Sequence, residues 1–199
     1  PLPLLLDRFG RPYQNQQQGR PMDGETILAG IDFNIQNTNA VLFVKRGSTL
    51  WAFDEVVAAY DTDALGQEIR NRYPDHRILG YPDASGNKRT TNATRSDIAI
   101  LDSYQISNQA PSANPPVRDR IAAVQALLEN GKGETSLYFD PACKKAIECM
   151  ELQSYNEKGD PDKDTGYDHL NDAIGYVVHR LRSLELGATG RVVKGIRLY

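Results

Sequence analysis

The first half of the chain carries short apolar runs that are typical of β-strands. Residues 26–33 (TILAGIDF) are almost continuously apolar, which predicts a strand buried on both of its faces. Two more runs follow directly, joined by a Gly-Ser turn that is typical of a hairpin. The pattern as a whole predicts strands at 26–33, 39–48, 49–57, 76–83 and 135–140.

Apolar positions at helical spacing fill the intervals between these runs. The segment 117–130 has the pattern of an amphipathic helix. Asp61 or Thr62 is suited to cap the first helix, and Pro141 is suited to the first turn of the fourth. The spacing predicts helices at 62–73, 96–104, 117–130, 141–155 and 168–186.

The order of these elements predicts an α/β fold with a mixed central sheet and helices on both of its faces. The opening hairpins exclude a purely parallel sheet. Residues 1–25 are rich in Pro, Gln, Gly and Arg, which predicts an irregular lead-in or linker before one domain at 26–199. Because the chain opens abruptly and without Met, we expect it to be part of a longer protein.

The composition is that of an ordinary globular domain, with 40% hydrophobic and 25% charged residues. No apolar run approaches the length that crosses a bilayer, and the first residues are too short and too broken by prolines for a signal peptide. Cys143 and Cys149 are spaced for neither a metal site nor a disulfide, which favours a reducing cytosol. The formal charge of −3 argues against a module that binds DNA by charge alone.

Three aspartates stand out because of their positions in these elements. Asp32 ends the first strand, Asp83 ends the fourth, and Asp172 lies near the start of the last helix. Carboxyl ends of neighbouring strands meet at one edge of a sheet, so we expect these carboxylates to converge there. Crowded oxygen ligands of this kind suit Mg²⁺ or Mn²⁺, and two such ions roughly 3.5–4 Å apart support phosphodiester hydrolysis.

Each of these positions also has a simpler interpretation. Asp83 could form a turn with the following Ala-Ser-Gly, Asp172 could be a solvated helix residue, and Asp168 could be a helix cap. The combination favours a site, because an aspartate between Ile31 and Phe33 in an apolar strand is costly to bury unless it is paired or metal-bound.

The motifs AGIDFN…NAVLF, YPDASG and DHLNDAIGY together resemble the C-terminal nuclease domain of the large terminase subunit of tailed phages. The resemblance implies an RNase H-like fold with Asp32, Asp83 and Asp172 as the catalytic metal ligands. It implies an endonuclease that uses Mg²⁺ or Mn²⁺ to cut concatemeric viral double-stranded DNA in the host cell cytoplasm. It also implies an N-terminal ATPase domain in the same protein, with the portal and the small terminase subunit as partners. This chain contains no G-x-x-x-x-G-K-[ST] motif of its own.

Two further residues are candidates for the same site. His169 lies one turn before Asp172 on the same helix face, where it could bind metal or orient the attacking water; a structural histidine is an equal alternative. Asp168 is a candidate alternate ligand. For Glu55, at the end of the third strand, we expect a solvent-facing side chain instead.

Basic residues near Asp83 are candidates for DNA-phosphate contacts. They are Lys88, Arg89 and Arg95, whereas Arg191, Lys194 and Arg197 in the tail are expected to be ordinary solvated charges. Two other interpretations stay open: a Holliday-junction resolvase or transposase-like nuclease, and a non-catalytic DNA- or motor-interaction domain of the same fold. GIDFNIQNTNA also suggests an actin- or Hsp70-like ATPase, but the segment after the aspartate has no glycine and the chain is too short for two lobes.

Overall fold

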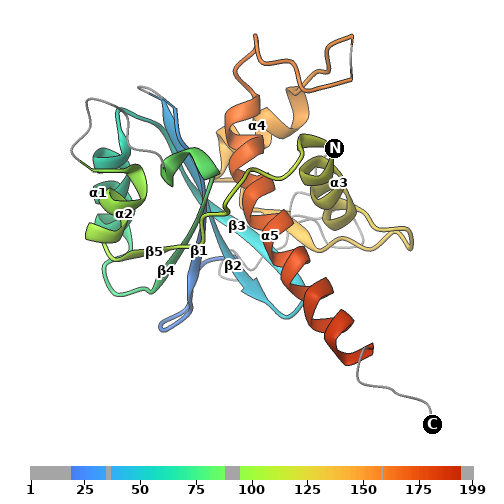
Figure 1. The fold of residues 1–199 in the computed structure, drawn as a ribbon, viewed down its shortest axis with the longest axis horizontal. Helices are drawn as coiled ribbons and strands as arrows, with labels where there is room; N and C mark the ends of the chain where they lie inside the picture. The colour runs from blue at the N-terminus through green and yellow to red at the C-terminus, as the bar shows by residue number, and fades with distance from the viewer. Residues whose placement is uncertain (1–18, 35–36, 88–94, 158, 194–199) are drawn as a thin grey trace.

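The computed structural model describes residues 19–34, 37–87, 95–157 and 159–193, and a mixed six-stranded sheet lies at the centre of this described part (Figure 1). The strand order is β5-β4-β1-β2-β3-β6. Strands β1, β2 and β3 form an antiparallel meander, while β4 pairs in parallel with β1 and β5, and β6 pairs in parallel with β3. The strands are β1 (Ile27–Asp32), β2 (Thr38–Arg46), β3 (Thr49–Ala59), β4 (Ile78–Pro82), β5 (Ile106–Asn108) and β6 (Leu137–Phe139).

Helices cover both faces of this sheet, which confirms the predicted fold class. Two helices lie on one face and three on the other, within the described residues (Figure 1). The first face carries α1 (Thr62–Arg72) and α2 (Asp97–Ser103). The second carries α3 (Val117–Leu128), α4 (Lys144–Leu152) and α5 (Asp168–Val193), and a short 3-10 helix, η1 (Ala84–Asn87), follows β4.

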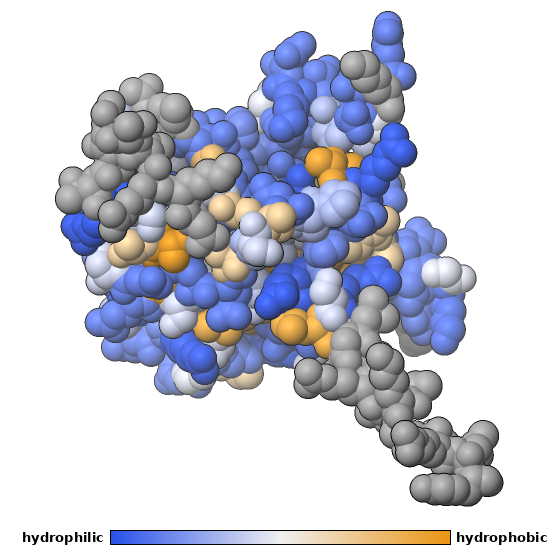
Figure 2. Space-filling model, viewed as in Figure 1, coloured by the Kyte–Doolittle hydropathy of each residue, from blue (hydrophilic) through white to orange (hydrophobic). Residues whose placement is uncertain are grey.

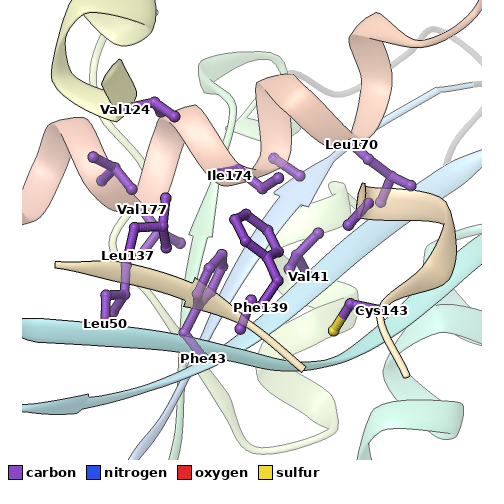
Figure 3. Close-up of a cluster of buried hydrophobic side chains, with 14 of the residues drawn as sticks. Val41, Phe43, Leu50, Val124, Leu137, Phe139, Cys143, Leu170, Ile174 and Val177 are labelled. Atoms are coloured by element: carbon purple, nitrogen blue, oxygen red, sulfur yellow. The ribbon is translucent and has the colours of Figure 1, made fainter. Parts of the chain in front are cut away.

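The two faces of the sheet bury separate apolar cores, which explains why the β1 sequence does not alternate with polar residues. Under α3, α4 and α5, Phe43 and Phe139 of the sheet meet Ile174 and Val177 of α5 (Figure 3). On the opposite face, alternate residues of β1 pack with α1 and α2. Each fully buried side chain of this size contributes about 1.5–3 kcal/mol to folding, so burial of both faces fixes the register of β1.

Helix α5 lies directly against β1 at Gly30. A Cβ atom built at position 30 would overlap the backbone carbonyl of Ala173 and the side chain of Val177. Because Gly30 has no side chain, the backbones of β1 and α5 come into direct contact. This contact sets the position of the first turn of α5 relative to the end of β1.

Several predicted boundaries are wrong in ways that have local causes. Strand β5 was not predicted, because three residues before a proline-containing loop give almost no periodicity. The fourth predicted helix begins at Lys144 rather than Pro141, because Asp140 Oδ1 accepts a hydrogen bond from the Ala142 amide and holds a turn there. One capping prediction is confirmed. Asp61 caps α1, and its side chain accepts a hydrogen bond from the Ala64 amide.

The outer surface is mainly polar on the face drawn in Figure 2, where hydrophobic side chains form small and separate patches. The large hydrophobic residues that are exposed in the described part of the chain are Met22, Val57, Tyr60, Leu152, Tyr155 and Leu184. Among the described residues, no helix has both the length and the apolar character needed to cross a membrane.

The contact at Gly30 predicts a large effect of adding one methyl group. Gly30→Ala should lower the free energy of unfolding by about 3 kcal/mol, the upper end for overpacked cores, because the obstacle is backbone. Thermal unfolding should then occur about 10 °C lower. Gly131→Ala, at a position with open space around it, is the matched control and should change the melting temperature little. Equal melting temperatures for the two variants would contradict the close packing.

Candidate metal centre

Asp32 and Asp83 lie side by side because they end neighbouring parallel strands. Ile31 of β1 pairs with Pro82 of β4, and the Asp83 amide donates a hydrogen bond to the Ile31 carbonyl at 3.3 Å. Both side chains are buried, with 6% of Asp32 and 7% of Asp83 exposed. The expected convergence of two strand-end carboxylates at one edge is therefore present in the structure.

Asp83 is also a turn residue. Its Oδ1 accepts hydrogen bonds from the Ser85 amide at 2.7 Å, the Ser85 hydroxyl at 2.6 Å and the Gly86 amide at 3.3 Å. Phe33 packs over this turn, where Gly86 leaves room for its ring. The simpler interpretation of Asp83 thus accounts for one of its oxygens, and these bonds fix the orientation of the carboxylate.

The first turn of α5 brings His169 and Asp172 to the same edge. His169 Nδ1 lies 3.2 Å from Asp32 Oδ2 and 3.0 Å from Asn34 Nδ2, and the Asn34 amide also donates to Asp32 Oδ2. Asp172 Oδ1 lies 2.6 Å from Nη1 of Arg120, which reaches across from α3. Asp172 is therefore an ion-paired residue and not a solvated one.

Asp168 is buried at the start of α5. Its Oδ2 lies 3.7 Å from Lys163 Nζ, and its Oδ1 makes no hydrogen bond to the described residues and lies 4.0 Å from His169 Nδ1. Asp168, Asp172 and Arg120 line a cavity of about 230 Å³ between α3, α4 and α5. A buried carboxylate oxygen without a donor is costly, so a cation near it would be stabilising.

The pKa of Asp32 is raised to about 8. Burial is the largest cause, followed by repulsion from the negative charges of Asp172 and Asp83, whereas the hydrogen bond from Asn34 acts in the opposite direction. Asp168 adds a smaller repulsion. These carboxylates therefore share one electrostatic environment, and a nearby divalent cation would remove the strain that now favours a proton on Asp32.

The residues at this edge fit Mg²⁺ or Mn²⁺ by their chemistry, since carboxylate oxygens are the ligands that these ions prefer. In the part of the chain that the structure describes, however, no three His, Cys, Asp or Glu side chains already stand in a metal-binding arrangement. Coordination by Asp32, Asp83 and Asp172 together would need side-chain adjustment around the ion. Their roles as metal ligands stay predictions.

Glu55 does not face solvent as expected. Its two carboxylate oxygens accept hydrogen bonds from the Lys145 amide at 2.8 Å and the Ala146 amide at 2.7 Å, at the start of α4. A carboxylate is stabilising at a helix N-terminus because the first amides have no partner within the helix. Glu55 is therefore a cap that joins β3 to α4, and the expectation was wrong.

Only some of the basic residues that are candidates for DNA contacts lie in the described part of the chain. Arg95 is exposed and directly precedes Ser96, whose side chain caps α2. Lys88 and Arg89 lie outside the described residues, as do Lys194 and Arg197 of the tail, and the side chain of Arg191 is not described.

The sequence pattern did not identify Arg120 and Asn34 as residues of this edge. Arg120 had a usable signal, because it lies three residues after Val117 and four before Val124, on the buried stripe of an amphipathic helix where a charge is unusual. Asn34 had none, since it lies in an irregular segment after β1 and its role depends on the distant His169.

The raised pKa of Asp32 predicts how stability depends on pH without metal. When a carboxyl group has a higher pKa in the folded state than in the unfolded state, its protonated form stabilises the fold. This contribution is complete at pH values below the unfolded-state pKa and is lost as pH rises to the folded-state pKa. Metal-free protein should thus lose stability between about pH 4 and pH 8. Asp32→Asn should remove this loss, so its advantage in melting temperature should grow from pH 4 to pH 8. A constant difference across this range would contradict the assignment.

The comparisons with known proteins agree with this fold. A family model described as the Terminase RNaseH-like domain matches residues 30–181, more than half of the chain. The nuclease domain of the P22 large terminase is 13% identical with a TM-score of 0.62, over 82% of this chain and 84% of that chain. The nuclease domain of the bacteriophage SPP1 large terminase, with bound Mn, is 20% identical with a TM-score of 0.52, over 78% and 86%.

The chain is also similar to part of a longer protein. The large terminase of a thermophilic bacteriophage, in complex with ATP-γ-S, is 19% identical with a TM-score of 0.58. The match covers 80% of this chain but 41% of that one, so this chain spans less than half of that protein. No curated protein matches. At these identities the solved structures show the fold, which confirms the expected RNase H-like architecture, and the family model shows the family. This chain belongs to the terminase RNase H-like domain family.

Proposed function

We propose that this domain is a metal-dependent endonuclease that cuts concatemeric viral double-stranded DNA during genome packaging in the host cell cytoplasm. The observation that carries the proposal is the acidic edge of the sheet. There Asp32 is buried among the charges of Asp172, Asp83 and Asp168, and its pKa is raised to about 8. Clusters of crowded, perturbed carboxylates are typical of catalytic sites. Family membership favours this function over a resolvase or transposase-like nuclease.

The three aspartates would have different roles in binding the metal. Asp32 would be the central ligand of Mg²⁺ or Mn²⁺, because its carboxylate interacts electrostatically with those of Asp172, Asp83 and Asp168. Asp83, oriented by its turn, and Asp172, paired with Arg120, would complete the ligand set. When bound, such ions activate a water and stabilise the leaving oxygen of a phosphodiester. A solved structure of the SPP1 relative contains Mn, which supports the choice of metal.

His169 would orient Asp32 in this arrangement. Its ring nitrogen Nδ1 lies 3.2 Å from the carboxylate, and Asn34 bridges the two side chains. With Asn34 donating to Asp32 Oδ2, this oxygen is held in place while Oδ1 is left for other partners. Asp168 would serve as an alternate ligand or as a second carboxylate that increases the attraction for a cation.

The wider assembly is also part of the proposal. The match to a large terminase in complex with ATP-γ-S covers less than half of that protein, which supports an ATPase domain encoded beside this one. We expect double-stranded DNA as the substrate and the portal and small terminase subunit as partners. Arg95, together with Lys88 and Arg89, would contact DNA phosphates, and residues 1–25 would lead in from the preceding domain.

The decisive test is cleavage of plasmid DNA by wild type and by Asp32→Asn, with Mg²⁺, Mn²⁺ or EDTA. Wild type should cut with either ion and not with EDTA, and Asp32→Asn should lose activity by at least about a hundredfold because water activation and leaving-group stabilisation both depend on the ions. Asp75→Asn, an exposed residue in the turn before β4, removes the same charge and should cut normally.

Melting temperatures measured on the same preparations separate the alternatives. If Asp32 is a purely structural residue, Asn should lower the melting temperature and leave cleavage intact. A stable Asp32→Asn protein that cuts at the wild-type rate would end the catalytic assignment. Wild type that never cuts with either ion would favour a non-catalytic DNA- or motor-interaction domain.

Cleavage by this domain should depend strongly on salt and little on sequence. Non-specific contacts with DNA are mainly contacts with phosphates, and each contact releases counterions, so affinity falls steeply as salt concentration rises. Between about 50 and 200 mM NaCl, initial rates at low DNA concentration should drop by at least tenfold. The products should form a smear on a gel. Discrete bands from a defined sequence, or rates unaffected by salt, would count against this mode of binding.

A further inference from the structure

Arg120 is a buried arginine in direct contact with the acidic edge. Only 5% of it is exposed, and it reaches from α3 to α5, where Nη1 lies 2.6 Å from Asp172 Oδ1. Nη1 and Nε make no aligned hydrogen bond to the described residues. The contact with Asp172 is therefore an ion pair, held by charge rather than by hydrogen-bond geometry.

Three residues of α5 pair with, contact or leave room for the side chain of Arg120. The guanidinium carbon of Arg120 lies 4.6 Å from the centre of the Tyr176 ring, a cation–π distance. A Cβ atom at Gly175 would lie 3.3 Å from the Cβ of Arg120, so the glycine leaves room for the arginine stem. Asp172, Gly175 and Tyr176 follow one another within about one turn, and all three accommodate the same residue.

Packing of α3 on α5 does not require a charge at this position. The neighbouring buried residues of α3 are Ala123 and Val124, and an apolar side chain at 120 would continue their surface. Burying a guanidinium removes its hydration, and replacing a buried ion pair by well-packed apolar residues is often neutral or stabilising. Unlike an apolar residue, an arginine at this position can pair with the carboxylate of Asp172 and restrict its movement.

We propose that Arg120 is a positioning residue that holds Asp172 ready to bind a divalent cation. The proposal rests on the metal-dependent function given above. The ion pair engages Oδ1 of Asp172, which restricts rotation of the side chain and leaves Oδ2 as a ligand. A ligand fixed before binding loses less conformational entropy when the ion arrives, so the ion binds more tightly. The positive charge also offsets part of the repulsion between Asp172 and Asp32.

The test is the affinity for Mn²⁺, measured by isothermal titration calorimetry below the melting temperature of every variant. Arg120→Met should raise the Kd about tenfold or more, the size of effect seen when a residue that orients a metal ligand is removed. Arg120→Lys should raise it less, because lysine keeps the charge but lacks the planar fork. Arg118→Met is the matched control: it lies on the same helix, is exposed and removes the same charge, so its Kd should equal that of wild type.

Three outcomes would overturn the proposal in distinguishable ways. A purely structural Arg120 would lower the melting temperature of Arg120→Met but leave its Kd unchanged. An Arg120 that acts only by competing with the cation would give tighter Mn²⁺ binding when it is removed. Absence of Mn²⁺ binding by wild type would instead remove the proposed function, and this proposal with it.

A second measurement checks the pair itself without metal. Arg120→Met should lower the melting temperature less in an Asp172→Asn background than in wild type, because no unpaired carboxylate is then left behind. Equal losses in the two backgrounds would mean that Arg120 and Asp172 are not coupled, and would contradict the positioning role.

Discussion

The backbone of α5 rests on β1 at Gly30, and the geometry of the acidic edge depends on this contact. The Ala173 carbonyl occupies the space that a side chain at position 30 would need. Asp172 directly precedes Ala173, and Asp32 lies two residues beyond Gly30, so one contact sets how far apart the two carboxylates stand. A wider gap would separate them and would also open the apolar core between the helix and the sheet. Because residue 30 is a glycine, the same close contact determines both the packing of the core and the spacing of the two carboxylates.

The acidic edge is electrostatically unfavourable by itself and is stabilised by partners from several elements. Asn34 donates to Asp32, Arg120 pairs with Asp172, and the turn after β4 donates to Asp83. Each partner engages one oxygen of its carboxylate. Burial of Asp32, together with the remaining negative charges of Asp172 and Asp83, raises the pKa of Asp32 to about 8. The fold thus tolerates a local electrostatic repulsion that a divalent cation would relieve.

Most of the sheet could be predicted from sequence, and so could the convergence of Asp32 and Asp83, because both follow from local rules. Apolar runs indicate strands, and an aspartate that ends a buried strand can be recognised without knowing its neighbours. The role of all three aspartates as metal ligands stays a prediction. Glu55 and Arg120 could not be assigned in the same way, since their partners lie 90 and 52 residues away in the sequence, at Lys145 and Asp172. Local pattern shows that such a residue is unusual, but only packing shows what it contacts. Strand β5 was not predicted for a different reason: three residues are too few to show a periodic pattern.

The sign of the charge at this edge also bears on how an acidic domain can act on DNA. Four carboxylates, those of Asp32, Asp83, Asp168 and Asp172, would repel a phosphate that approached them without counter-ions. Bound divalent ions reverse the local sign, so they would attract the phosphate as well as support its hydrolysis. Arg120 cannot replace them in this role, because it is buried and its charge is already paired with Asp172. The domain would therefore acquire its affinity for the scissile phosphate together with its metal, and DNA held elsewhere by the protein would remain uncut until the ions are in place.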